Sequence, residues 1–218
     1  MRGVMNCLPP CIYPRITRPD FLENAAPRPG IAPAPGGQYK AQTPIARAVA
    51  GDIDLRVTYA IDFPTQRTTL THGCMKQLGL DAQGVHAQAV ENLHRKTSQK
   101  VATQDLVAYK ALVTGDDLEA CMLLLPDLWA GLSKGFKGEL IAVVPSKNAL
   151  YFMDSRATLT IAGQPVSTTT RLALMCSAAT RVRAEAGAQG LSDQVIALTP
   201  EGWKVRGTFG AHEAVLPA

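Results

Sequence analysis

Apolar and polar residues alternate along residues 55–61, and this period of two is typical of a strand with one buried face. Leu55, Val57, Tyr59 and Ile61 form the apolar set, and the pattern ends at Asp62, just before Pro64. The β-favouring residues 68–71 follow closely. The sequence therefore predicts a half-buried strand with a short partner.

Apolar residues at helical spacing predict two longer helices. In residues 81–97 the apolar positions recur every four residues behind Asp81, a favourable N-cap. Residues 168–186 show a similar stripe, which ends before Gly187. Two shorter helices are expected at residues 71–78 and from Pro126 onward.

The remaining apolar runs predict strands joined by tight turns. Residues 140–144 and 150–153 flank a short connection, as do residues 195–198 and 203–205. Residues 106–113 predict a further strand, and residues 118–125 form a largely buried run. The predicted fold is α+β: a mainly antiparallel sheet with the two longer helices packed on it, preceded by a Pro-rich extended leader.

Proline is concentrated at the start of the chain, where nine of the 15 prolines come before residue 45. Residues 25–38 are a Pro/Ala/Gly stretch that favours neither a helix nor a paired strand. We therefore expect a partly disordered leader and linker at residues 1–50, with a short docking strand at residues 11–18. A single α+β domain at residues 51–210 and a frayed C-terminus at residues 211–218 complete the prediction.

The net charge of +4 belongs to the leader. Residues 1–50 hold six basic and two acidic side chains, whereas the rest of the chain holds 16 of each. A basic arm of this kind can bind nucleic acid or an acidic partner. Its charges are singly spaced and lack interleaved aromatic residues, so a solvated leader is favoured and nucleic-acid binding is the weaker hypothesis.

The composition favours a cytoplasmic protein without a membrane segment. No stretch approaches the roughly 20 apolar residues of a membrane-spanning helix. The Leu8–Cys11 segment interrupts any signal-peptide core, and the odd number of cysteines, five, argues against a disulfide framework. Cys7 and Cys11 lack a second ligand pair, so the sequence predicts neither a metal nor a cofactor.

The usual catalytic motifs are missing. We find no nucleophile elbow, no H-E-x-x-H pair, no C-x-x-C and no phosphate-binding or dinucleotide-binding glycine pattern. Whether the protein is an enzyme is therefore open, and the missing motifs favour a protein that is not an enzyme.

Six residues are nevertheless candidates for a polar site. Asp62 stands at a strand end, His86 lies beside an apolar helix stripe, and Ser146 sits in a tight connection; these are the catalytic candidates. The binding candidates are Asn92, Lys147 and Asn148. Each also has an ordinary structural interpretation, such as a turn-capping aspartate or a packed histidine.

Four segments, in order, resemble landmarks of the YtpQ-like proteins, a bacterial family of unknown function. They are Val57–Pro64 (VTYAIDFP), Leu78–Leu93 with its LGL turn, Cys121–Trp129 (CMLLLPDLW) and Val143–Leu150 (VVPSKNAL). The resemblance covers about residues 54–155 and implies an α+β cytosolic protein without a known activity. The family's turn has the sequence Pro-Ser-Arg-Asp, whereas this chain has Pro145-Ser146-Lys147-Asn148. The aspartate carboxylate is therefore missing here, so a mechanism that needs it is not expected.

Two functions of different kinds remain from the sequence. The preferred one is a non-catalytic domain that binds a protein or small-molecule partner. The alternative is a hydrolase-like enzyme whose cleft joins Asp62, His86, Asn92, Ser146 and Lys147, with His86 as base and Lys147 as anion clamp. The sequence leaves the oligomeric state open.

Overall fold

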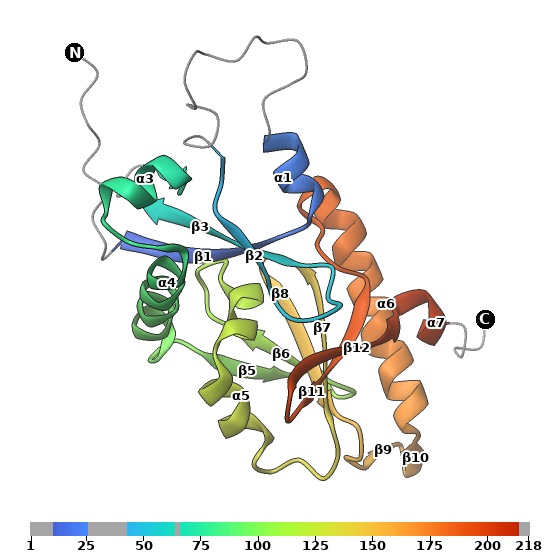
Figure 1. Cartoon of the computed structure of the whole chain (residues 1–218). Coiled ribbons are helices and arrows are strands. Elements are labelled where there is room, and N and C mark those ends of the chain that lie inside the picture. Colours follow the sequence, from blue (N-terminus) through green and yellow to red (C-terminus); the bar gives the residue numbers. More distant parts are fainter. Residues whose placement is uncertain (1–10, 26–42, 64–65, 214–218) are drawn as a thin grey trace. The chain divides into compact units, whose positions relative to one another are not determined.

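The computed structural model describes residues 11–25, 43–63 and 66–213 (Figure 1). The chain divides into two compact units, which are described separately. Unit 1 comprises Met1–Arg47 and Arg56–Ser98, and unit 2 comprises Ala48–Leu55 and Gln99–Ala218. This division reflects which parts of the backbone lie close together. It does not test the predicted single domain at residues 51–210, which stays a prediction.

Unit 1 is built on a small sheet in the order β1-β3-β2, with β4 pairing to β3. Its elements are β1 (Ile12–Thr17), α1 (Asp20–Ala25), β2 (Ala46–Ala48), β3 (Arg56–Asp62), β4 (Arg67–Thr69), α3 (His72–Gln77) and α4 (Ala82–Thr97). β1 runs antiparallel to β3, with Ile12 opposite Ile61 and Thr17 opposite Arg56. An edge strand thus lies where the sequence predicts a docking strand.

β3 is buried on both faces. Thr58 and Ala60 are only 3% and 4% exposed, so the prediction of a half-buried strand is wrong. The strand lies between β1 and β2 in the sheet. The buried residues of its second face, Thr58 and Ala60, have small side chains. The alternation of polar and apolar residues therefore predicted a more exposed strand than the structure shows.

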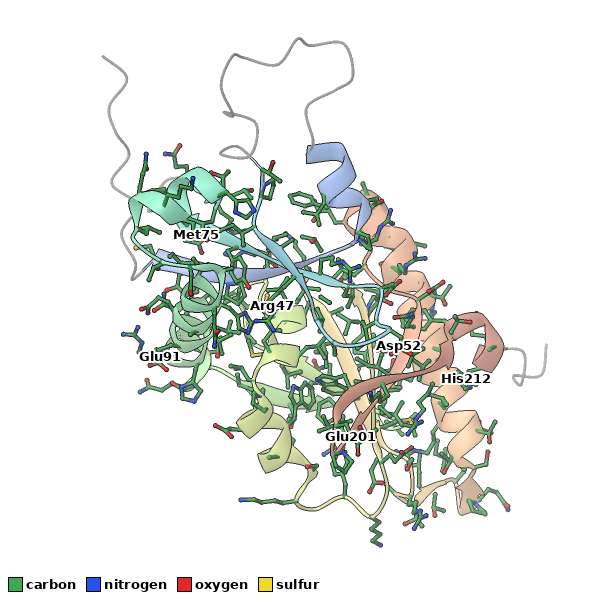
Figure 2. The ribbon with its side chains drawn as sticks, viewed as in Figure 1. Arg47, Asp52, Met75, Glu91, Glu201 and His212 are labelled. Atoms are coloured by element: carbon green, nitrogen blue, oxygen red, sulfur yellow. The ribbon has the colours of Figure 1, made fainter. Side chains whose placement is uncertain are left out.

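α4 packs on β1 through its apolar stripe of Val85, Ala89 and Leu93, all fully buried. The helix begins after Asp81, whose carboxylate accepts a hydrogen bond from the Gly84 N–H at 2.6 Å. On the opposite face Glu91 is exposed to solvent and pairs with Arg95 (Figure 2).

Unit 2 contains a six-stranded sheet in the order β12-β11-β7-β8-β6-β5, in which every neighbouring pair is antiparallel. Its strands are β5 (Ala102–Asp105), β6 (Lys110–Val113), β7 (Leu140–Ser146), β8 (Ala149–Asp154), β11 (Gln194–Thr199) and β12 (Gly202–Thr208). A separate hairpin joins β9 (Leu159–Ile161) to β10 (Gln164–Val166). The helices are η2 (Glu119–Leu124), α5 (Pro126–Ser133), α6 (Thr168–Ala186), η3 (Gly187–Gln189) and α7 (Phe209–Glu213).

Two predicted segments of unit 2 differ in the structure. The continuous strand expected at residues 106–113 is a tight turn followed by β6, because local hydrogen bonds fold residues 106–109 back on themselves. The buried run at residues 118–125 is the 3₁₀ helix η2. Glu119 at its start accepts hydrogen bonds from the N–H groups of Thr114 and Gly115, which fixes the preceding turn.

Helices lie on both faces of this sheet (Figure 1). One face presents Val143, Met153 and Val195 to the buried stripe of α6. On the other face Phe152 of β8 and Trp203 of β12 contact the ring of Trp129 in α5, with ring centroids 5.6 and 5.2 Å apart. The period of two along the strands thus separates two apolar layers.

The prediction of an α+β fold with mostly antiparallel sheets is confirmed. Within the described residues, no helix has both the length and the apolar character that crossing a membrane requires. Residues 1–10 and 26–42 of the predicted leader, and residues 214–218 of the predicted frayed end, lie outside the described residues.

Gly138 tests the packing of the turn before β7. A Cβ atom at this position would lie 2.3 Å from Ser155 Oγ and 2.8 Å from the backbone nitrogen of Arg156. We expect Gly138→Ala to lower the free energy of unfolding by about 1–3 kcal/mol, since the backbone must move to admit the methyl group. Urea unfolding measures the change.

Gly131 of α5 is the matched control, because a Cβ there meets open space. Gly131→Ala should leave stability unchanged or raise it by up to about 1 kcal/mol. Equal stabilities for Gly138→Ala and the wild type would contradict the packing described here.

Candidate functional site

The six candidate residues divide between the two units. Asp62, His86 and Asn92 belong to unit 1, whereas Ser146, Lys147 and Asn148 belong to unit 2. Each of the six has hydrogen-bond or ion-pair partners within its own unit.

Asp62 is the centre of an ion-pair cluster at the end of β3. Its carboxylate accepts hydrogen bonds from Arg15 Nη2 at 2.8 and 2.9 Å and from Arg67 Nε at 2.9 Å. Lys96 Nζ lies 3.9 Å away. Both oxygens of this carboxylate are therefore already engaged by cationic donors, which gives Asp62 a structural role at the end of β3.

His86 forms a hydrogen-bonded pair with a buried tyrosine. Its Nδ1 lies 3.0 Å from the hydroxyl of Tyr59, which is 1% exposed. Burial lowers the pKa of His86, and the positive charge of Arg47 lowers it further. Burial also raises the pKa of Tyr59 to about 12. At neutral pH the pair is therefore an uncharged imidazole beside an uncharged phenol.

Asn92 links α4 to β1. Its side-chain amide donates to the carbonyl of Ile12 at 2.8 Å, and its carbonyl oxygen accepts from Gln88 and Arg95. This buried amide therefore has a structural role in unit 1.

The turn between β7 and β8 holds the other three candidates. Ser146 is 1% exposed and donates to Asn148 Oδ1 at 2.7 Å. The Lys147 ammonium instead pairs with Asp117 at 2.9 Å, and both side chains are partly exposed. None of the six candidates lines the pocket described next.

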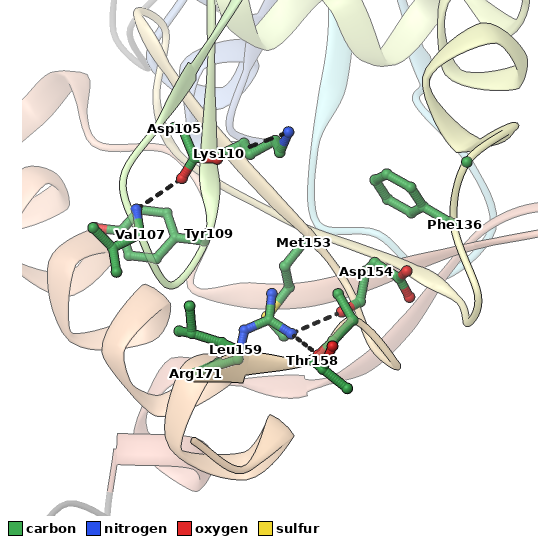
Figure 3. A pocket seen from close by; sticks show the side chains of 12 residues that line it. Asp105, Val107, Tyr109, Lys110, Phe136, Met153, Asp154, Thr158, Leu159 and Arg171 are labelled. Atoms are coloured by element: carbon green, nitrogen blue, oxygen red, sulfur yellow. Dashed lines mark hydrogen bonds and ion pairs between the residues drawn. The ribbon is translucent and has the colours of Figure 1, made fainter. Parts of the chain in front are cut away.

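Unit 2 contains a pocket with a volume of about 330 Å³ (Figure 3). It is lined by the β5–β6 turn, the segment before β7, the end of β8, residues 157–159 and the first turn of α6. Its volume is near the lower end of the range found for small-molecule sites. Its apolar lining comes from Val107, Tyr109, Phe136, Met153 and Leu159.

A buried arginine forms part of the pocket. Arg171, in the first turn of α6, is 6% exposed. Its Nε donates to the Ala108 carbonyl at 3.0 Å, and its Nη1 donates to the carbonyls of Asp154 at 3.3 Å and Ala157 at 2.7 Å. Among the described residues, no carboxylate lies within ion-pair distance of this guanidinium.

The third nitrogen of Arg171, Nη2, has no hydrogen-bond partner among the described residues. In Figure 3 it points away from the bonded carbonyls, toward the space between Tyr109 and Met153. A charged donor in this position can bind an oxygen of a ligand. Because Nε and Nη1 are engaged, Nη2 alone would donate a charge-assisted hydrogen bond to that oxygen.

Asp154 supplies a negative charge to the lining of the pocket. Its carboxylate accepts hydrogen bonds from the N–H groups of Lys137, Gly138 and Arg156 at 2.8–2.9 Å. Burial alone would raise the pKa of this carboxyl, but these bonds and the nearby Arg171 charge together lower it. The carboxylate is thus ionised and occupied by backbone donors.

The rim of the pocket carries a looser pair of charges. Lys110 Nζ lies 4.0 Å from Asp105 Oδ2, and both side chains are about half exposed or more. The lining therefore contains two positive and two negative side chains, and Arg171 is the most deeply buried of them.

Sequence reasoning overlooked this pocket, although two signals point to it. Arg171 precedes Met175 by four residues, so it shares the buried face of the helix, where a charged residue requires an explanation. Asp154 stands at the end of β8, as Asp62 does at the end of β3. Arg171 bonds to carbonyls that are distant in sequence, so these bonds produce no recognisable pattern in the sequence around Arg171.

Within the part of the chain that the structure describes, no cluster of three or more His, Cys, Asp or Glu side chains could hold a metal ion. Comparisons of the chain with protein families, with curated proteins and with solved structures found no match. The resemblance to the YtpQ-like proteins stays a prediction.

The pKa of His86 is directly measurable. We expect its NMR titration midpoint to lie below the ordinary value of 6.5, and Arg47→Gln to raise it, because one repulsive charge is removed. Since the unfolded chain binds this proton more readily, the contribution of His86 to stability is complete above about pH 6.5. It is lost as the pH falls through the folded-state pKa.

His86→Gln serves as the control, because it identifies the His86 resonance and removes this part of the pH dependence of stability. A midpoint at or above 6.5 would contradict the burial of His86 beside Tyr59.

Proposed function

We propose that the protein is a non-catalytic ligand-binding domain whose pocket in unit 2 binds a small organic anion through Arg171. The main support is the buried guanidinium, whose other nitrogens bind backbone carbonyls while Nη2 is directed into the pocket. Burying a charge that is only partly satisfied by hydrogen bonds is unfavourable. A bound anion would offset part of that penalty.

The charges of the lining favour a singly charged ligand. Arg171 and Lys110 are balanced by Asp154 and Asp105, so the lining has no excess positive charge. A dianion such as phosphate would place a second negative charge near Asp154. A monocarboxylate would use Arg171 Nη2 with less of that repulsion, because it carries one negative charge.

Binding is supported by the most deeply buried charged group of the lining, Arg171, because a guanidinium is a hydrogen-bond donor and not a nucleophile. The proposed cytoplasmic location and the proposed kinship with YtpQ-like proteins are compatible with this function and do not identify a ligand. Nucleic-acid binding is less favoured, because two basic residues of the front segment, Arg15 and Arg18, are paired with Asp62 and Asp20.

A second candidate function is acid–base catalysis at His86. The hydrogen-bonded contact between Tyr59 and His86 and the lowered pKa of His86 favour it, because a neutral imidazole can accept a proton. A substrate screen would test this candidate. An activity that survives His86→Gln would exclude His86 as the base.

Titration with acetate, followed by ¹⁵N NMR, tests the anion site. We expect the amide signals of Tyr109 and Gly135, which line the pocket, to shift with millimolar affinity. Arg171→Lys should weaken acetate binding about tenfold or more, because an ammonium group cannot place a planar donor at the Nη2 position.

Arg181→Lys on the exposed face of α6 is the matched control and should bind acetate as the wild type does. Thermal unfolding of both variants shows whether the fold is retained. Unchanged acetate binding by a folded Arg171→Lys variant would refute the proposed site.

A further inference from the structure

The β5–β6 turn has an unusual backbone at Val107. Its φ angle is +69°, a region that β-branched residues rarely adopt. The Ala108 N–H donates to the carbonyl of Leu106 at 2.8 Å, which closes a three-residue turn with Val107 at its centre. Turns of this kind with a positive central φ are rare and strained.

Neighbouring hydrogen bonds hold the turn in place. The Val107 N–H donates to Asp105 Oδ1 at 2.9 Å, and the Leu106 N–H donates to the carbonyl of Tyr109 at 2.9 Å. The carbonyl of Ala108 accepts from Arg171 Nε. The strained turn is thus connected directly to the proposed anion-binding side chain.

The side chain of Val107 is 64% exposed, although it is apolar and lines the pocket. Asparagine, aspartate or glycine would fit this backbone better and would suit an exposed turn. Strained residues of this kind are concentrated at functional sites. The combination of strain, exposure and pocket lining therefore indicates contact with a ligand.

The remaining lining supports the same view. Tyr109, Phe136, Met153 and Leu159 provide an apolar wall that an ion as small as acetate would leave largely unused. Contacts with such a wall add affinity in proportion to the apolar area that they remove from water.

We propose that the ligand is a monocarboxylate with an apolar, aromatic or branched aliphatic body, and that Val107 is the residue that selects this body. The inference rests on the proposed function, because the carboxylate is bound by Arg171. The apolar body would lie against the wall, with Val107 covering it at the rim.

Affinities for acetate and phenylacetate test the inference. We expect the wild type to bind phenylacetate at least tenfold more tightly than acetate. Val107→Gly should lose most of this difference and keep its affinity for acetate. Its thermal midpoint should stay close to that of the wild type, because glycine adopts the positive φ without strain while its unfolded chain is more flexible.

Two further variants distinguish the effect of the Val107 side chain on binding from effects of the backbone. Val107→Thr keeps the branched shape but replaces a methyl with a hydroxyl, and we expect it to bind phenylacetate several-fold less tightly. Val113→Ala removes a partly exposed valine of the same hairpin that does not line the pocket, and it should change neither affinity.

The outcomes distinguish the two proposals. Absence of binding of either carboxylate, or binding that Arg171→Lys leaves unchanged, would overturn the proposed function and the inference with it. Equal affinities for acetate and phenylacetate, or a preference for phenylacetate that survives Val107→Gly, would overturn only the inference.

Discussion

The buried guanidinium of Arg171 holds together segments of unit 2 that are far apart in sequence. Its hydrogen bonds fix the β5–β6 turn through Ala108, the end of β8 through Asp154 and the following segment through Ala157. Loss of these carbonyls would leave a buried charge without partners, which is costlier than losing ordinary hydrogen bonds. The geometry of the pocket therefore depends on the hydrogen bonds that satisfy the Arg171 guanidinium.

The same interaction gives the pocket its chemistry. Three carbonyls satisfy part of the guanidinium, and Asp154, held by three backbone N–H groups, contributes a negative charge without an ion pair. One nitrogen is left for a ligand. The cluster around Asp62 in unit 1 is different, because its carboxylate directly meets three cations.

Much of the fold could be predicted from the sequence, whereas the pocket could not. Short apolar runs and turn residues located the hairpins of β7–β8 and β11–β12, because these pairings are local. The strand predicted at residues 106–113 failed, since the apolar Leu106 and Val107 hide a turn that is supported by hydrogen bonds to Asp105 and Arg171. Candidate site residues were chosen for their reactivity, while Arg171 matters because of its burial and its non-local partners. Burial of that kind is a property of tertiary structure.

The most direct test of the account is NMR of the arginine side chains during titration with phenylacetate, with 2-phenylethanol as the uncharged counterpart. We expect the guanidinium signals of Arg171 to shift on addition of phenylacetate and to stay unchanged with 2-phenylethanol, while those of the exposed Arg181 respond to neither. Equal shifts of Arg171 with both compounds, or no shift with phenylacetate when the protein binds it, would contradict the account.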